Sequence, residues 1–136
     1  MNELGTCSLL LVDDNPTDTE LTREAIEQQG LPIAVRIAGD GRAAIAMLAS
    51  FPDGELPKLM LLDINMPGVN GFDVLEYVRS RPELRAMPVI MLTTSSAPGD
   101  RARALAGGAT DYLVKPRRFA DLLALVDRLR PYFPGL

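Results

Sequence analysis

Five residues in this sequence carry side chains that suit phosphoryl chemistry, and each one ends or follows a short apolar run: Asp13, Asp14, Asp63, Thr93 and Lys115. A carboxylate can attack phosphorus as a nucleophile, while a hydroxyl and an ammonium can stabilise the charge on phosphoryl oxygens. If the apolar runs are neighbouring strands, these side chains meet at one edge of a sheet. The pattern therefore predicts a phosphoryl-transfer site.

Three of these side chains are carboxylates, and gathering them is unfavourable without a cation. Two such charges about 4 Å apart repel by about 4 kcal/mol at an effective dielectric constant of 20. The chain has no histidine, and its single cysteine, Cys7, cannot form a multi-thiolate metal site. Oxygen ligands from separate loops suit Mg²⁺, so we expect Asp13, Asp14 and Asp63 to bind magnesium. The alternative is that Asp13 and Asp14 only cap a helix or a turn.

Apolar runs alternate with helical segments along the chain, which predicts a doubly wound α/β domain. The runs lie at residues 8–12, 33–38, 59–62, 89–92 and 112–114. Two of them, 59–62 and 89–92, are apolar without alternation, as expected for central strands of a parallel sheet with helices on both faces. In such sheets a ligand site forms beyond the carboxyl ends of the strands, which is where the five residues stand.

Capping and breaking residues mark the helices between these runs. Asn15 and Pro16 suit the start of a helix over 16–29, which Gly30 then ends. We expect four further helices, namely one from Asp40 through Leu48, one from Asn70 or Gly71, one ending at Gly107-Gly108, and one with an apolar face from Phe119 to Leu129. Residues 50–57, rich in proline, glycine and charge, read as a surface loop.

Composition excludes several classes of function. A length of 136 residues suits one domain. The net charge is −4, so the sequence gives no sign of the basic surface that nucleic-acid binding requires. The single cysteine, the lack of a leader-like start and the lack of a membrane-length apolar run favour a cytoplasmic protein. Because histidine is absent, the chain cannot be a histidine kinase, a His-containing phosphotransfer protein or a Ser-His-Asp hydrolase.

Four short motifs resemble those of the receiver domains of two-component response regulators. They are Leu-Val-Asp-Asp-Asn at 11–15, Leu-Asp-Ile-Asn-Met-Pro-Gly at 62–68, Met-Leu-Thr-Thr at 91–94 and Val-Lys-Pro at 114–116. All four occur in the family's order, each at the end of a predicted strand, and together they span nearly the whole chain. The resemblance implies a flavodoxin-like, CheY-like fold, in which five helices flank a five-stranded parallel sheet of order 2-1-3-4-5.

The resemblance also implies how the acidic residues act. Asp63 would be the phospho-acceptor. Asp13, Asp14 and Asp63 would hold Mg²⁺, with Asp14 often bound through water, and Asn65 would offer its backbone carbonyl to the metal.

Two further roles follow from the same resemblance. Thr93 and Lys115 would bind phosphoryl oxygens, and the peptide bond between Lys115 and Pro116 would be cis, which only a bond before proline tolerates readily. On phosphorylation Thr93 would move toward the phosphoryl group and Tyr112 would turn inward behind it. The alternative for Tyr112 is a half-buried strand aromatic with its hydroxyl in water.

A more specific resemblance concerns partners. Residues 50–57, 81–84, 87–89 and 92–96 look like the single-domain regulators that partner bacterial phytochrome histidine kinases. We expect residues 1–136 to form one receiver domain without an output domain, which receives its phosphoryl group from a histidine kinase or phosphotransfer protein and acts on another protein. Members of that subgroup pair through helix 4, strand 5 and helix 5. The charged residues that suit such a homodimer, or simply a solvated face, are Arg101, Arg103, Asp111, Arg117, Arg118 and Asp121.

Two other functions are weighed against this one. A haloacid-dehalogenase-type phosphatase also uses a strand-end aspartate with Mg²⁺, but it needs a second aspartate where this chain has Asn65. A receiver-like scaffold that binds partners without phosphorylation usually lacks an acidic residue, the threonine or the lysine, and none is missing here. We therefore expect a signalling switch that catalyses only its own phosphorylation and dephosphorylation.

Overall fold

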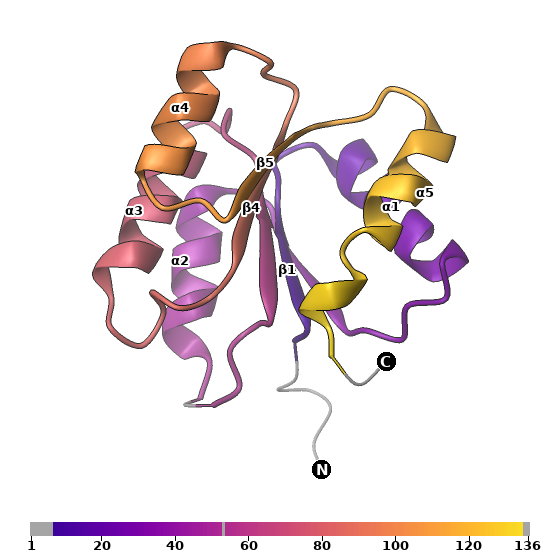
Figure 1. The fold of residues 1–136 in the computed structure, drawn as a ribbon. Coiled ribbons are helices and arrows are strands. Elements are labelled where there is room, and N and C mark those ends of the chain that lie inside the picture. Colours follow the sequence, from indigo (N-terminus) through magenta and orange to yellow (C-terminus); the bar gives the residue numbers. More distant parts are fainter. Residues whose placement is uncertain (1–6, 53, 135–136) are drawn as a thin grey trace.

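A parallel sheet lies between two layers of helices (Figure 1), and the computed structural model describes residues 7–52 and 54–134. Over these residues, five strands alternate with five helices and a short 3₁₀ helix follows: β1 (Leu9–Val12), α1 (Pro16–Gln28), β2 (Val35–Ala38), α2 (Gly41–Ser50), β3 (Leu59–Leu62), α3 (Gly71–Ser80), β4 (Val89–Thr93), α4 (Pro98–Ala106), β5 (Asp111–Val114), α5 (Phe119–Asp127) and η2 (Arg130–Tyr132).

The strands pair in the order β2-β1-β3-β4-β5, all parallel, which confirms the predicted fold class and strand order. β1 is paired with β2 on one side and with β3 on the other. The winding direction reverses between β1 and β3, so the crevice expected for a ligand lies at their carboxyl ends.

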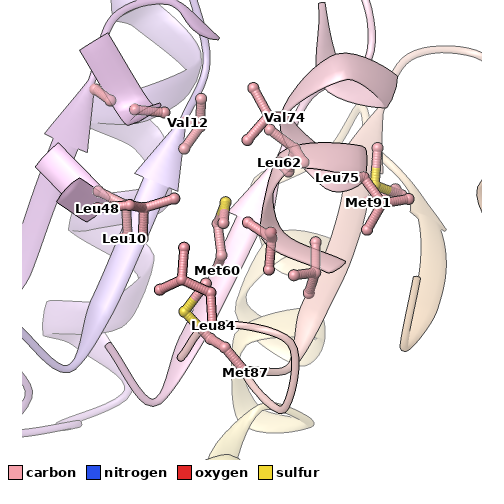
Figure 2. Close-up of a cluster of buried hydrophobic side chains, with 14 of the residues drawn as sticks. Leu10, Val12, Leu48, Met60, Leu62, Val74, Leu75, Leu84, Met87 and Met91 are labelled. Carbon is pink, nitrogen blue, oxygen red and sulfur yellow. The ribbon is translucent and has the colours of Figure 1, made fainter. Parts of the chain in front are cut away.

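Successive residues of the central strands point to opposite faces of the sheet, and both faces are covered. Leu10 and Met60 belong to a buried cluster with side chains of α2, α3 and α4, much of which Figure 2 shows. Leu9 and Leu59 belong to a second cluster with side chains of α1 and α5. This double burial explains why the strand sequences are apolar without alternation.

Asparagine and aspartate start three of the helices. The side chain of Asn15 accepts hydrogen bonds from the backbone N–H groups of Thr17 and Asp18 at the start of α1. Asp40 accepts from the N–H of Ala43 in α2, at 2.7 Å. At α3, Asn70 and Asp73 form a complete capping box.

Some boundaries differ from those predicted. β2 begins at Val35 rather than Ile33, because the N–H of Ile33 is used in a turn to the carbonyl of Leu31. α5 ends at Asp127 rather than Leu129, because the backbone tightens there: the N–H of Leu129 bonds to the carbonyl of Val126, three residues back, and the 3₁₀ helix η2 follows from Arg130. The aromatic residues that follow pack against the second cluster, where Phe133 is buried.

In the described part of the chain, no helix is both long enough and apolar enough to cross a membrane.

Candidate functional site

The ends of β1 and β3 bring three carboxylates together. The N–H of Asp13 donates to Ala38 and the N–H of Asp63 donates to Val12, so the backbone ladder continues through both aspartates. Oxygens of Asp13, Asp14 and Asp63 lie within 4.8 Å of one another. Asp13 and Asp63 are buried and Asp14 is exposed, so the cluster opens to solvent on one side. The structure thus gathers the three carboxylates that the sequence pattern singled out.

The loop after Asp63 is closed tightly over it. The N–H of Gly71, the first residue of α3, donates to the carbonyl of Ile64 at 2.9 Å. A Cβ on Gly71 would overlap the carbonyl oxygen of Asp63, so this position requires glycine. The exposed Asn65 lies within this loop, two residues after Asp63. A fixed loop here keeps both residues in place.

Lys115 directly follows β5 and extends its ammonium among the carboxylates. Its Nζ lies 2.6 Å from Asp13 Oδ2, 2.8 Å from Asp18 Oδ2 and 3.7 Å from Asp63 Oδ2. Burial by itself lowers the pKa of Lys115, but the hydrogen bonds to Asp13 and Asp18 and the charge of Asp63 raise it above its ordinary value. The ammonium is therefore firmly protonated.

Asp63 is the least satisfied acidic group of the site. Burial raises its pKa above the ordinary value; Lys115 opposes this effect and the neighbouring charge of Asp13 reinforces it. Its Oδ1 is a buried oxygen without a hydrogen-bond partner among the described residues. A buried carboxylate oxygen in this state favours a cation or a hydrogen-bond donor beside it.

Thr93 and Tyr112 are both buried, and both form hydrogen bonds to Ser95. Thr93 ends β4 with its side chain fully buried, and its Oγ1 accepts a bond from the N–H of Ser95 at 3.3 Å. Tyr112 is 3% exposed, and its hydroxyl donates to the carbonyl of Ser95 at 2.7 Å. The tyrosine hydroxyl is therefore bonded inside the protein, and the alternative of a hydroxyl in water is wrong for this structure.

The peptide bond between Lys115 and Pro116 was predicted to be cis, and this prediction is wrong. The backbone described for this protein contains no cis peptide bond. Even before proline the trans form is favoured by about 0.5–1 kcal/mol. The ammonium of Lys115 reaches Asp13 across the trans bond, so contact with the site does not require the cis form.

Two polar contacts at or beside this site were not predicted from the sequence. Asp18, in the first turn of α1, pairs with Lys115. The Oγ of Ser95 donates to Asp100 Oδ2 at 2.6 Å and connects the loop after β4 to α4. No spacing rule could have indicated the Asp18 contact, because it joins segments 97 positions apart whose distance depends on the packed fold. The Ser95 contact is local and spans five residues.

The comparison with known families agrees with this geometry. The family model for the response regulator receiver domain matches residues 9–127. The chain belongs to the receiver family. As a receiver domain it is a phospho-accepting signalling module of two-component systems.

Relatives of this receiver domain match most of its length. The probable methanogenesis regulatory protein FilR2 of Methanothrix harundinacea is 36% identical over 129 residues, which are 93% of this chain and 83% of that protein. Response regulator Rcp1 of Synechocystis sp. is 31% identical over 128 residues, which are 92% of this chain and 87% of that protein.

Solved structures of receiver domains are also similar. The Mn²⁺-bound form of Rcp1 has a TM-score of 0.82 at 30% identity, and the match covers 96% of each chain. The phosphorylated cyanobacterial phytochrome response regulator RcpA has a TM-score of 0.84 at 28% identity, covering 96% of this chain and 95% of that one.

The acidic cluster fits the divalent cation that receiver domains bind through acidic residues. Its donors are carboxylate oxygens, one of which, Asp63 Oδ1, is buried without a partner. Hard oxygen donors with one side open to water match the preference of Mg²⁺.

Proposed function

We propose that this receiver domain accepts a phosphoryl group on Asp63 and thereby changes its affinity for another protein. The observation that carries the proposal is the state of Asp63. This buried carboxylate has one oxygen 3.7 Å from the Lys115 ammonium and the other without a partner, beside two further carboxylates. Such an oxygen is a nucleophile that is not engaged in a structural bond.

The transfer itself is a displacement at phosphorus. An oxygen of Asp63 forms a bond to phosphorus while the bond from phosphorus to the donor atom breaks, and the electron pair of that bond leaves with the donor. With a phosphohistidine donor the leaving atom is an imidazole nitrogen. Lys115 pairs with one phosphoryl oxygen, and the hydroxyl of Thr93 donates to another.

Asp13, Asp14 and Asp63 would hold Mg²⁺, together with the backbone carbonyl of Asn65. When bound, the ion supplies positive charge that offsets the repulsion between the carboxylates and an incoming phosphoryl group. The protein's own contribution is to keep the carboxylates within reach of one another.

Incubation with acetyl phosphate and Mg²⁺, followed by intact mass measurement, tests the proposal. We expect the wild-type chain to gain the mass of one phosphoryl group and Asp63→Asn to gain none, because the amide is a poor nucleophile. Chelation of Mg²⁺ should prevent the gain. No adduct on the wild type, or the same adduct on Asp63→Asn, would overturn the proposal and favour a scaffold that works without phosphorylation.

Thr93 and Tyr112 would transmit the phosphorylation state to the surface. A bound phosphoryl group would draw the Thr93 hydroxyl away from the N–H of Ser95. The carbonyl of Ser95 in turn accepts a hydrogen bond from the Tyr112 hydroxyl. A change at Thr93 therefore reaches the loop before α4 and the strand β5 together. The mechanism is a shift between populations that exist before phosphorylation.

The phosphoryl donor would be a sensor histidine kinase or a phosphotransfer protein. The likeness to RcpA, described as a phytochrome response regulator, favours a kinase of the phytochrome type. Phosphotransfer measured against the kinases of the source organism, each labelled first, tests this partner. A kinase of another class that transfers fastest would contradict the phytochrome assignment.

A second copy of this chain is a proposed partner at the face formed by α4, β5 and α5. Two large apolar side chains are exposed there, Leu105 at 42% and Val114 at 46%. Charged residues of both signs belong to the same elements and the loop between them, which suits an isologous contact between identical faces. Arg103 instead lies over the ring of Phe72 in α3, 4.0 Å from its centroid, so it faces away from β5.

A further inference from the structure

We propose that Asp18 is a positioning residue of the phosphoryl site, which holds the ammonium of Lys115 beside Asp63. The inference rests on the proposed function and adds a residue to it. Asp18 lies in the first turn of α1, 97 positions from Lys115 in sequence, and neither the apolar runs nor the family motifs assign it a role.

The contact is short and sheltered. Lys115 Nζ lies 2.8 Å from Asp18 Oδ2, and only 12% of the lysine side chain is exposed. An ammonium has three N–H donors. The carboxylates of Asp13 and Asp18 take two at hydrogen-bond distance, while Asp63 lies farther away at 3.7 Å. The lysine is therefore fixed by two neighbours and has one donor left for a group on Asp63.

The Asp18 carboxylate does not form the helix-capping bond that its position in α1 allows. Both α1 and α3 begin with asparagine followed three residues later by aspartate. In α3, Asp73 bonds back to the N–H of Asn70 at 3.0 Å and completes a capping box. In α1, the equivalent N–H, that of Asn15, donates to Asp13 Oδ1 instead. The carboxylate of Asp18 is thus free for Lys115.

Asp18 differs from the other acidic partners of Lys115 because it is not one of the proposed metal ligands. Asp13 and Asp63 belong to the cluster that would hold Mg²⁺, and Asp63 is the proposed nucleophile. Asp18 lies outside that cluster, so its hold on the ammonium persists while the other two carboxylates change partners. It keeps a long, flexible side chain in position for a phosphoryl oxygen.

The first test needs no phosphorylation. In the metal-free protein, the Lys115 side-chain ammonium should give a slowly exchanging ¹H–¹⁵N NMR signal, because both close partners shelter it. Asp18→Ala should broaden or remove that signal, and Asp73→Ala, the matched position of α3, should leave it unchanged. The same signal in Asp18→Ala and in wild type would show that Asp18 does not hold the Lys115 ammonium and would overturn the proposal.

The second test measures the rate of phosphorylation by acetyl phosphate at saturating Mg²⁺. We expect Asp18→Ala to be on the order of tenfold slower, since misplacing a reacting group by about 1 Å costs up to about a hundredfold. Asp73→Ala should keep the wild-type rate, although it loses a helix cap. Asp18→Asn, which keeps the side-chain volume and an acceptor oxygen, should recover part of the rate and serves if Asp18→Ala folds poorly.

A double-mutant comparison separates action through Lys115 from a general effect of charge. In a Lys115→Ala background, the further change Asp18→Ala should not alter the rate. An equal slowing in both backgrounds, or a faster Asp18→Ala protein, would overturn the positioning role. If wild type gains no phosphoryl group, the proposed function fails and this role with it, while the NMR result still reports the contact separately.

Discussion

The surroundings of Asp63 disfavour the ionised form of its carboxylate. Asp63 is 6% exposed and lies near the charge of Asp13. Lys115, which could neutralise its charge, is closer to Asp13 and Asp18. A group with a raised folded-state pKa contributes stability below its unfolded pKa and loses that contribution as pH rises through the folded value. The free protein thus keeps, at some cost in stability, the carboxylate that we propose to be the phosphoryl acceptor.

Asp63→Asn should therefore stabilise the metal-free protein at pH 7. Removing the charge removes the unfavourable burial, so the melting temperature in a chelator should rise. The difference from wild type should grow as pH increases above 3.8, the ordinary pKa of the group, because the unfolded wild-type chain then loses this proton while the folded protein still holds it. It should level off once Asp63 is ionised in the fold as well. Thermal unfolding followed by circular dichroism at several pH values measures this.

Glu55→Gln is the control for this change, since it alters net charge equally at an exposed residue. It should leave the melting temperature nearly unchanged. A lower melting temperature for Asp63→Asn than for wild type would mean that the pairing with Lys115 outweighs the burial of the charge.

At the scale of elements, the loop between β4 and α4 is held from two sides. The Oγ of Ser95 accepts from the N–H of Ala97 at 3.3 Å as well as donating to Asp100, and α4 has no side-chain cap at Ala97. From the other side, Arg101 donates to the carbonyl of Tyr112 at 3.2 Å. These bonds make the loop, α4 and β5 one connected unit.

Tyr112→Phe should loosen this unit without changing the packing of the ring. Loss of the bond to the Ser95 carbonyl should reduce the free energy of unfolding by about 1 kcal/mol. Urea unfolding measures the loss, and amide exchange of residues 94–97 should speed up. Tyr77→Phe is the matched control, because the hydroxyl of Tyr77 has no hydrogen-bond partner among the residues the structure describes. Equal effects of the two changes would contradict the proposed coupling.

At the scale of the whole molecule, the large apolar side chains that are exposed among residues 7–52 and 54–134 lie on two separate surfaces. Leu105 and Val114 belong to α4 and β5, while Leu21 lies on α1 and is 40% exposed. Figure 1 places α1 and α4 on opposite sides of the sheet. One surface can therefore be changed without disturbing the other.

We expect the protein to sediment as a dimer after treatment with acetyl phosphate and Mg²⁺, and Leu105→Gln or Val114→Gln to remain monomeric. Burying these side chains against a second copy removes apolar surface from water, and glutamine reverses that gain. Leu21→Gln should dimerise like wild type. Sedimentation velocity, with mass measurement to verify phosphorylation, tests this. A monomer throughout, or equal disruption by Leu21→Gln, would place any contact elsewhere.

The sequence by itself determined the fold and the residues that gather at its edge. Apolar runs such as 59–62 are typical of strands buried on both faces of a parallel sheet, and polar residues at the carboxyl ends of such strands share one edge. Asp13, Asp63 and Thr93 were predictable for that reason. Helix starts at Asn15 and Asn70 were predictable because capping is local.

Only the tertiary structure decided which hydrogen-bond partners those residues have. Two helices with the same asparagine and aspartate spacing use their aspartates differently, because the N–H of Asn15 is within reach of Asp13 and that of Asn70 is within reach of Asp73. The trans bond after Lys115 and the inward hydroxyl of Tyr112 likewise depend on distances between segments. Residue type and spacing along the chain do not encode those distances, which arise when the strands and helices pack.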